Sequence, residues 1–179
     1  MHVRFPTLED LNACFHLDGS VDTSHVWQVR HTVHAERVTF TLQRVPLPRP
    51  ARLAYPPLGN LLMRQYEARD GIWVALEAGR VQGFALAIWD EEEGLAWLRH
   101  LVVDRKARRR GVGSALLRYA ARAAADRRLT RLVVAVNVKN DPAIQFLHHH
   151  GFTCVGYNGA HFASGDYAIY LGRSLRRWV

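Results

Sequence analysis

The stretch that decides the fold of this chain is LVVDRKARRRGVGSALLRYAARAAA, residues 101–125. An apolar run ends at position 103, a basic turn carries Gly111 and Gly113, and the residues after the turn have helical periodicity. Glycine lets a backbone approach a ligand closely, and the start of a helix offers unpaired N–H groups and about half a positive charge. This strand, turn and helix predict a binding site for phosphate oxygens, to which the arginines at 108–110 add charge.

Length and composition indicate one globular domain. The chain has 179 residues, 49% of them hydrophobic, which is enough to bury a proper core. No segment approaches the roughly 18 apolar residues of a membrane span, and the N-terminus lacks the apolar stretch of a signal peptide. Cys14 and Cys154 lie far apart and form no CxxC pattern. We therefore expect a cytoplasmic protein with ordinary thiols and no membrane partner.

The net charge of +8 comes almost wholly from arginine and predicts an anionic partner. Nucleic acid, an acidic protein and a polyphosphate cofactor would all satisfy this charge. By itself, a basic run such as residues 105–110 is most often a solvated or nucleic-acid-facing patch. The glycines between strand and helix favour a cofactor instead. A dinucleotide-binding fingerprint would need a third glycine at position 116, where this chain has Leu116.

The N-terminal residues predict a short strand at 3–5 followed by a helix. Thr7 stands three residues before Asp10, a spacing typical of a capping box. The helix is expected to run to about position 17. Its apolar positions, spaced as on one helix face, are Leu8, Leu11 and Phe15.

Residues 20–71 predict a hairpin, a loop and a short helix. Alternation between positions 25 and 45 indicates a β-hairpin that turns at 35–37. Five of the seven prolines fall between positions 46 and 57. They predict an irregular loop over 45–59, which serves either as a surface connection or as a wall of the substrate site. A short helix is expected over 60–69.

The remaining sequence predicts a central sheet with helices. Tight turns make the first three of its strands antiparallel neighbours, and Asp141 is the expected cap of the last helix, with Pro142 at the first position. The expected elements are strands at 72–76, 81–89 and 95–103, a helix after the glycine turn, a central strand at 129–138, a helix from Asp141, and strands at 153–157 and 166–171.

Two motifs on these elements resemble those of the GNAT acetyltransferase superfamily. Arg108-x-x-Gly111-x-Gly113 matches its R/Q-x-x-G-x-G/A signature, and Asn140-x-x-Ala143 followed by Gly-Phe at 151–152 resembles its second motif at the expected interval. The resemblance is strong over 72–152 and weak over 20–71.

This resemblance implies the fold class and the domain organisation. The fold would be α/β (α+β), with a GNAT-type mixed, mostly antiparallel central sheet flanked by helices and an inserted N-terminal β-hairpin. The chain would form a single acetyltransferase domain over 1–179. Residues 72–158 would be the acetyl-CoA-binding core, and 20–71 a variable segment that shapes the substrate site.

For such a family the phosphate ligand is acetyl-CoA, used as co-substrate. The resemblance implies that backbone N–H groups at 109–114 hold its pyrophosphate. The strand edge at 101–103 would pair with the pantetheine amides like an added strand, and Asn140 would face the cofactor from the next helix, in the cleft where the two central parallel strands part. The cofactor-binding residues implied are Leu101, Val102, Val103, Arg108, Arg109, Arg110, Gly111, Val112, Gly113, Ser114, Ala115, Asn140, Ala143 and Phe146.

The implied reaction is direct attack of an amine on a thioester. An ammonium must first lose a proton. His100, immediately before the apolar run at 101–103, is the candidate catalytic base, and the glutamates at 91–93 are a second candidate. The oxyanion that forms needs N–H donors, for which the backbone of Val102 and Val103 is implied.

The step that releases the thiolate marks a departure from the family pattern. The customary tyrosine position is occupied by Leu147, which cannot donate a proton. Tyr157 is the candidate catalytic acid, and Tyr167 and Tyr170 are further candidates. Without any of them, the thiolate would leave unprotonated, or the activity would be lost.

The acceptor is expected to be a primary amine of a small molecule, including an antibiotic-like one, or of a protein. Two other classes of protein remain as alternatives. One is an acyl-CoA-binding protein with weak or no turnover, and the other is a basic nucleic-acid-binding module. A nucleic-acid partner is the less favoured of the two. A monomer or homodimer is expected. Consecutive histidines at 148–150 would point about 100° apart on a helix, so no metal site is expected.

Overall fold

The structure is a computed structural model that describes residues 1–55, 58 and 60–178. The expected loop at 45–59 therefore lies partly outside the described residues, at Pro56, Pro57 and Gly59. The chain forms two compact units, each made of separated segments. The first comprises Met1–Gly19, Tyr55–Val134 and Gly172–Val179, and the second comprises Ser20–Ala54 and Ala135–Leu171.

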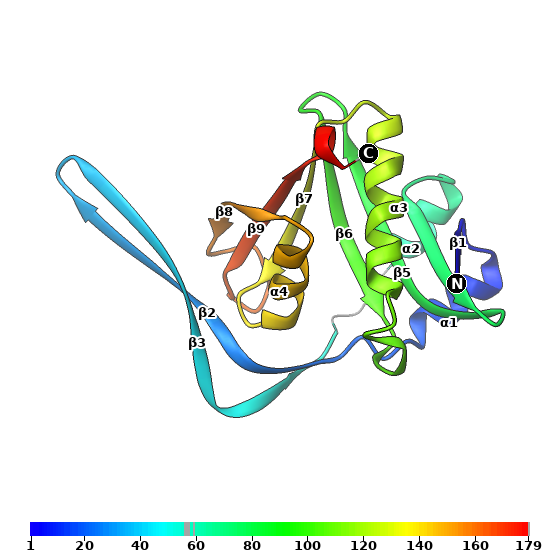
Figure 1. The fold of residues 1–179 in the computed structure, drawn as a ribbon, viewed down its shortest axis with the longest axis horizontal. Coiled ribbons are helices and arrows are strands. Elements are labelled where there is room, and N and C mark those ends of the chain that lie inside the picture. Colours follow the sequence, from blue (N-terminus) through cyan, green and yellow to red (C-terminus); the bar gives the residue numbers. More distant parts are fainter. Residues whose placement is uncertain (56–57, 59, 179) are drawn as a thin grey trace. The chain divides into compact units, whose positions relative to one another are not determined.

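In the described residues, the strands form a seven-stranded sheet in the order β1-β4-β5-β6-β7-β9-β8 and a separate two-stranded sheet, β2-β3. β7 and β9 contribute residues to both units. The strands are β1 (His2–Arg4), β2 (Val21–His34), β3 (Arg37–Leu53), β4 (Ile72–Glu77), β5 (Arg80–Asp90), β6 (Leu95–Val103), β7 (Arg131–Asn137), β8 (Thr153–Asn158) and β9 (Ala168–Ser174). The helices are α1 (Leu8–Phe15), α2 (Leu61–Glu67), α3 (Val112–Asp126) and α4 (Asp141–His149), with 3-10 turns η1 (Arg105–Ala107) and η2 (Leu175–Arg177) (Figure 1).

Strand pairing in the first unit confirms the expected antiparallel neighbours. β4 pairs with β5 and β5 with β6, both antiparallel. β6 pairs with β7 in parallel, from Leu95 opposite Arg131 to Trp97 opposite Val133. The predicted class, a mixed and mostly antiparallel sheet with flanking helices and an inserted hairpin, is confirmed. In the described residues, no helix has both the length and the apolar character needed to span a membrane.

The two faces of the β4–β6 sheet bind different helices. Phe84 and Val102 face each other across β5 and β6 and pack in one core cluster with Leu11 of α1 and Leu62 of α2. The alternate positions face α3, since Trp73 contacts the ring of Tyr119. Buried apolar surface on both faces accounts for the stability of this unit, because each buried aliphatic side chain contributes about 1.5–3 kcal/mol.

α1 begins as expected but buries a different face. The Thr7–Asp10 capping box is present, since each side chain accepts a hydrogen bond from the other residue's backbone N–H. Leu11 and Cys14 are buried, whereas Leu8 and Phe15 are exposed, so the expected apolar face was wrong at two of its three positions. An eight-residue helix packed on a sheet face buries only a narrow stripe, here Asp10, Leu11 and Cys14.

The second unit is built around a two-stranded ribbon of β2 and β3, drawn in blue and cyan in Figure 1. The hairpin prediction is confirmed, with its turn at Ala35 and Glu36. Its cross-strand pairs separate by face. Apolar and aromatic pairs such as His31–Phe40 lie on one face, while polar pairs such as Thr32–Thr39 lie on the other.

β3 continues through the proline-rich segment, so the expected irregular loop is wrong as far as Leu53. The three prolines between positions 46 and 50 alternate, and their missing N–H groups therefore face the same edge of the strand. The ribbon register also shifts there, between Thr23 and His25 of β2. Proline is tolerated in this strand because it falls at an edge and at a break in the ladder.

The cap of α4 is Asn140, and the expectation that Asp141 would cap this helix is wrong. Asn140 Oδ1 accepts a hydrogen bond of 3.2 Å from the backbone N–H of Ala143. Asp141 is the first helical residue and Pro142 follows it. Both residue types cap helices well, and here tertiary partners occupy the aspartate.

Candidate functional site

The turn between β6 and α3 has the geometry of an anion site. Gly111 is the N-cap of α3 with φ +83°, and no side-chain hydrogen bond caps this described helix end. The N–H of Ala115 donates to the carbonyl of Gly111, so the preceding N–H groups point out of the helix start. A Cβ added to Gly111 would meet nothing within 4 Å, so glycine is needed here for its conformation rather than for space. This turn fits a phosphate.

The arginines of the turn have separate tasks. Arg108 donates from Nε to the carbonyl of Val103 at 3.2 Å and from an Nη to the carbonyl of Asp18 at 3.3 Å. Arg110 forms an ion pair with Glu77. Arg109 is exposed and has a positive φ of 63°. Two of the three guanidinium groups thus hold the turn in place, whereas Arg109 is exposed on a backbone that is already in an unusual conformation.

The strand before the turn has one edge covered only in part. On the β5 side, Leu101, Val102 and Val103 face Ala85, Phe84 and Gly83. On the β7 side, the parallel ladder ends at the pair Trp97–Val133. The last residues of β6 therefore lie beyond the described β7 ladder. An extended chain with amide groups fits this edge in the manner of an added strand.

His100 lies on the α1–α2 face of β6, opposite Leu86. Tyr55 Oη is 2.5 Å from its Nδ1, and the ring of Phe84 lies 6.5 Å away. Burial, with a smaller contribution from Arg99, lowers the pKa of His100 to about 4, so the imidazole is neutral at pH 7. Burial also raises the pKa of Tyr55 above its ordinary value, so its hydroxyl keeps its proton.

Tyr55 was missed by sequence reasoning. It lies within the proline-rich segment at 46–57, and its aromatic ring is the only feature there that could have marked it. A Cβ added to Gly19 would lie 2.9 Å from Tyr55 Cγ and 3.1 Å from Val102 Cγ1. The absence of a side chain at Gly19 therefore leaves room for the Tyr55 ring against β6.

The remaining predicted cofactor residues lie on α4, in the second unit. Asn140 is used as the helix cap, and Ala143 supplies the N–H that it accepts. The Phe146 ring packs 4.4 Å from that of His150. Leu147 is only 3% exposed, so the side chain at the customary tyrosine position is part of the core. The predicted residues thus fall in both units, with the phosphate turn and His100 in the first.

Tyr157, the candidate acid, lies on β8 in the second unit. Its ring lies 5.0 Å from that of Phe40 and 6.3 Å from that of Tyr167. Tyr170 is engaged differently, because its hydroxyl lies 3.2 Å from both Asn158 Nδ2 and His161 Nδ1.

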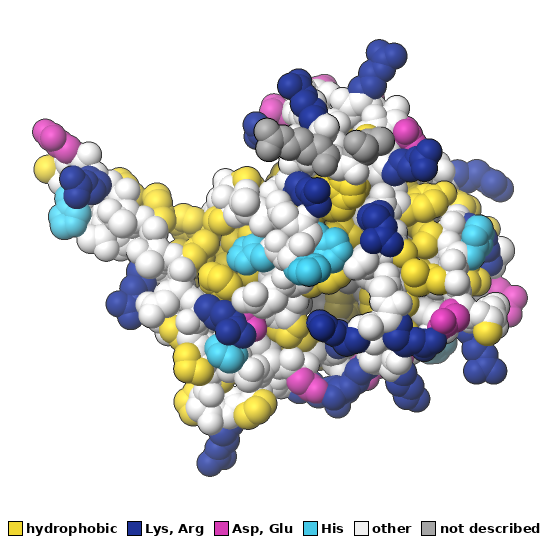
Figure 2. All heavy atoms as spheres, viewed as in Figure 1, with side chains coloured by type: hydrophobic (Ala, Val, Ile, Leu, Met, Phe, Trp, Pro, Cys, Tyr) yellow, Lys and Arg dark blue, Asp and Glu magenta, His cyan; other side chains and the backbone are white. Residues whose placement is uncertain are grey.

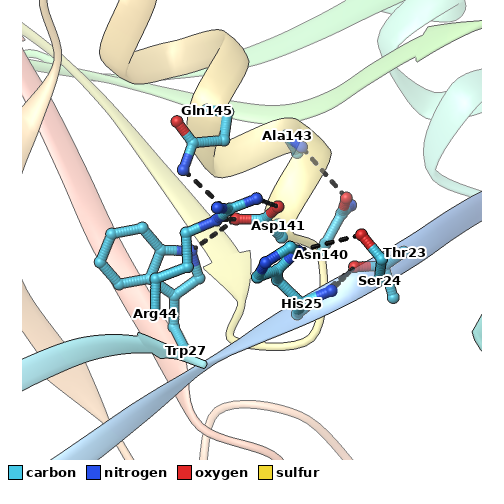
Figure 3. Close-up of polar contacts among 9 residues, drawn as sticks. All are labelled: Thr23, Ser24, His25, Trp27, Arg44, Asn140, Asp141, Ala143 and Gln145. Carbon is cyan, nitrogen blue, oxygen red and sulfur yellow. Dashed lines mark hydrogen bonds and ion pairs between the residues drawn. The ribbon is translucent and has the colours of Figure 1, made fainter. Parts of the chain in front are cut away.

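Asp141 is the centre of a polar cluster in the second unit (Figure 3). Arg44 donates two hydrogen bonds of 2.8 Å, one to each carboxylate oxygen. Trp27 Nε1 donates at 3.0 Å and Gln145 Nε2 at 3.3 Å. The hydrogen bond from Arg44 is the main reason that the pKa of Asp141 is held below its ordinary value. The cluster fastens the ribbon to the start of α4.

Comparison with known proteins gives the family. The family model described as "Acetyltransferase (GNAT) family" matches residues 38–152, more than half of the chain. The streptothricin acetyltransferase of Streptomyces lavendulae is 28% identical over 176 residues, which cover 90% of this chain and 88% of that protein.

Solved structures give the same fold. A crystal structure of nourseothricin acetyltransferase matches with a TM-score of 0.82 at 26% identity, covering 97% of this chain and 98% of that one. A protein of Bacillus anthracis str. Ames, solved in complex with acetyl coenzyme A, matches with a TM-score of 0.75 at 21% identity, with coverages of 97% and 98%. The chain belongs to the GNAT acetyltransferase family, whose acetyl donor is acetyl-CoA.

Proposed function

We propose that this enzyme transfers the acetyl group of acetyl-CoA to a primary amine, with a streptothricin-type antibiotic as the acceptor. The observation that carries the proposal is the glycine turn at the start of α3, directly after β6. It supports binding of a pyrophosphate at the helix N-terminus and of an extended amide chain along the preceding strand.

In this proposal the glycine turn of the first unit and the strand before it hold the donor. Backbone N–H groups at 109–114 and the exposed Arg109 bind the pyrophosphate, and the edge of β6 at 101–103 binds the pantetheine. Arg108 organises the turn through its bonds to Val103 and Asp18.

His100 is the proposed base. With a pKa of about 4, His100 is too weak a base for a free ammonium, so the acceptor reacts as the free amine. When the Nδ1–H of His100 donates to Tyr55 Oη, Nε2 carries a lone pair that accepts a proton from the amine nitrogen as it attacks and becomes acidic. The amine nitrogen attacks the thioester carbon, and the oxyanion that forms is stabilised by the backbone N–H of Val103, which lies on the edge of β6 away from β5. The carbonyl then re-forms as the bond to sulfur breaks. Since Leu147, at the customary tyrosine position, has no proton to give, the thiolate leaves as the anion in this proposal.

The choice of acceptor rests on the relatives. The streptothricin acetyltransferase match covers almost all of both chains, including the segment 20–71 that differs most from the family pattern. The nourseothricin acetyltransferase structure likewise covers nearly the full length of both chains. Similarity over that segment supports an acceptor of the same class, because it contains the ribbon and Tyr55.

Acetyl-CoA binding is tested by thermal unfolding of the wild type, Gly111→Ala and Gly79→Ala. The wild-type melting temperature should rise with acetyl-CoA, since a ligand of the native state stabilises it. Gly79 is the matched control, because it also has a positive φ and no neighbour within 4 Å of an added Cβ. Both variants should lose roughly 1 kcal/mol through backbone strain, but only Gly111→Ala should lose most of the response to acetyl-CoA. An equal response in both variants would show that the turn is not the phosphate site.

Acetyl transfer is tested by release of free thiol from acetyl-CoA with streptothricin and with a panel of simple amines. We expect release with streptothricin to exceed that with the panel. Acetyl-CoA binding without thiol release would indicate a binding protein. Thiol release with another amine but not with streptothricin would support acetyl transfer and contradict streptothricin as the acceptor.

A further inference from the structure

The segment that follows α1 in the first unit, residues 17–19, is hydrogen-bonded to the start of the glycine turn, and we call it the junction. The backbone N–H of Asp18 donates to Asp104 Oδ2 at 3.1 Å, and Arg105 N–H donates to the carbonyl of Asp18 at 3.0 Å. Arg108 donates to the same carbonyl at 3.3 Å. Both backbone groups of Asp18 are therefore held by the segment that leads from β6 into the turn.

Asp104 joins the junction to two further segments. Its Oδ1 accepts from the N–H of Lys106 at 2.9 Å as the cap of η1, while its Oδ2 accepts from Asp18. Its own N–H donates to the carbonyl of Gln82 on β5 at 2.9 Å. A carboxylate next to a phosphate site weakens anion binding through its charge. Its hydrogen bonds, which hold three segments together, are therefore the better explanation for its position.

The junction also lies against Tyr55. A Cβ added to Gly19 would be 2.9 Å from Tyr55 Cγ and 3.1 Å from Val102 Cγ1. A real Cβ essentially never comes within 3.0 Å of another heavy atom, so a larger residue at position 19 requires the Tyr55 ring to move. The backbone of Gly19 thus fixes where this ring lies next to β6.

Tyr55 in turn holds the ring of His100. Tyr55 Oη is 2.5 Å from Nδ1, and the two ring centroids are 6.0 Å apart with the planes at 63°. In the part of the chain that the structure describes, Nε2 of His100 has no hydrogen-bond partner, and no fully buried side-chain nitrogen lacks one. Nε2 therefore reaches the surface and is the nitrogen that can meet a substrate.

We infer that Tyr55 is a positioning residue for His100, and that the junction, held by Asp104, keeps Tyr55 in place. The contacts run from the glycine turn through Asp18 and Gly19 to Tyr55, so the donor turn and the proposed base share one support within the first unit. The inference rests on the proposed function and adds residues that act through His100 without taking up a proton themselves.

The first test is steady-state kinetics of Tyr55→Phe with streptothricin and acetyl-CoA. The variant leaves the buried Nδ1 of His100 without its partner, so kcat should fall about 5- to 50-fold, while the KM for acetyl-CoA should stay within about twofold. Tyr66→Phe is the matched control, because Tyr66 packs against the same core cluster and its hydroxyl has no hydrogen bond among the described residues. Equal kcat values in the two variants would overturn the inference.

A second measurement, NMR of protein with 15N-labelled histidine, observes His100 without any turnover. In Tyr55→Phe the Nδ1 signal should shift because its hydrogen bond is lost. The pKa of His100 should stay near 4, since burial is its main cause, with a smaller contribution from Arg99, and the phenylalanine ring keeps the site buried. An unchanged Nδ1 signal would overturn the contact on which the inference depends.

Gly19→Ala tests the junction in the same measurement. Its Cβ displaces the Tyr55 ring and admits water to His100, so the pKa of His100 should rise from about 4 toward 6.5. Gly156→Ala is the control, because its added Cβ meets only an ordinary contact, 3.4 Å from Tyr170 Cδ2. A pKa of His100 that stays near 4 in Gly19→Ala would show that the junction does not hold Tyr55.

A double-mutant cycle tests whether Asp104 acts through Tyr55. Asp104→Asn leaves one acceptor oxygen for two backbone N–H groups, so kcat should fall about 2- to 10-fold. In the Tyr55→Phe background the same change should have little further effect, because the two residues act in series. Asp90→Asn is the control, since its carboxylate accepts one backbone N–H, from Glu93 at 3.0 Å, and the amide oxygen can replace it. Additive effects of Asp104→Asn and Tyr55→Phe would overturn the shared support.

The kinetic and NMR results together separate this inference from the proposed function. Turnover by the wild type with unchanged kcat in Tyr55→Phe would overturn the positioning role and leave the reaction in place. Absence of thiol release by the wild type, with the expected changes at His100 in Tyr55→Phe and Gly19→Ala, would support the positioning role and overturn the proposed reaction.

Discussion

At the scale of single residues, His100 and Gly111 show how little chemistry a residue type determines by itself. A histidine within a strand is accessible or buried according to its neighbours, and here the rings of Tyr55 and Phe84 lie next to His100. Gly111 is determined locally, because a φ of +83° at a helix start is strained for a residue that carries a side chain.

Burial of His100 predicts a pH dependence of stability. In the unfolded chain this imidazole takes up a proton as the pH falls through about 6.5, whereas the folded protein resists until about 4. The unfolded state therefore binds more protons in this window, and stability is lost as the pH falls from 7 to 4.

We expect the free energy of unfolding of the wild type to fall by roughly 2–3 kcal/mol more than that of His100→Gln over this pH range. Urea unfolding at pH 7, 6, 5 and 4 measures the difference. Parallel pH profiles for the two proteins would contradict the buried, neutral state of His100.

At the scale of elements, the β2–β3 ribbon depends most on contacts with other elements for its stability. A two-stranded hairpin is marginally stable alone in water. The Arg44–Asp141 pair and the Trp27 hydrogen bond fasten it to α4. It matters which partner of this pair is removed, because the Asp141 side chain is 7% exposed and that of Arg44 is 40% exposed.

Arg44→Met should therefore destabilise the protein more than Asp141→Asn. The first leaves a buried carboxylate with neutral donors only, and we expect a loss of roughly 2–3 kcal/mol. The second leaves an arginine that reaches water, and we expect a loss of about 1 kcal/mol. Urea unfolding at pH 7 measures both values. The contribution of the pair is present above pH 4 and is lost as the pH falls through the lowered pKa of Asp141, so the two variants should converge in acid. A larger loss in Asp141→Asn at pH 7 would contradict this account.

Elements that depend on residues close together in the sequence were predicted correctly, and elements that depend on distant residues were not. The β4–β5 and β5–β6 turns, the capping box and the hairpin turn depend on residues a few positions apart, and the sequence predicted each of them. The strand through the prolines was not predicted, because its tolerance of missing donors depends on which edge of β3 faces away from β2. The cap of α4 was misassigned because Asn140 and Asp141 are equally good caps by residue type. The choice is made by Arg44, 97 residues away in the sequence, which binds the Asp141 carboxylate.

At the scale of the whole molecule, the net charge of +8 is the dominant property. Figure 2 shows Lys and Arg side chains spread over the viewed face, with apolar surface between them. Such a field attracts an anionic donor and repels a cationic acceptor over about one Debye length.

The two substrates should therefore respond to salt in opposite directions. Between about 0.05 and 0.5 M salt, the KM for acetyl-CoA should rise by a few-fold and the KM for an amine acceptor should fall or stay level. Steady-state kinetics at several salt concentrations measures both. An acetyl thioester without phosphate groups is the control, and its KM should not rise. An acceptor KM that rises with salt would indicate that carboxylates bind its ammonium and would contradict the expected repulsion by the net charge.

The sequence by itself determined the family, the order of strands and helices, and the glycine turn at the start of α3. These depend on periodicity, turns and glycine conformation, which act over a few neighbouring residues. Only the tertiary structure brought Tyr55 to His100, Arg44 and Trp27 to Asp141, and the ring of Tyr157 to that of Phe40. The Tyr55–His100, Arg44–Asp141 and Trp27–Asp141 contacts join residues 45, 97 and 114 positions apart. Contacts between such distant side chains leave no local pattern in the sequence, because they depend on how whole strands and helices pack.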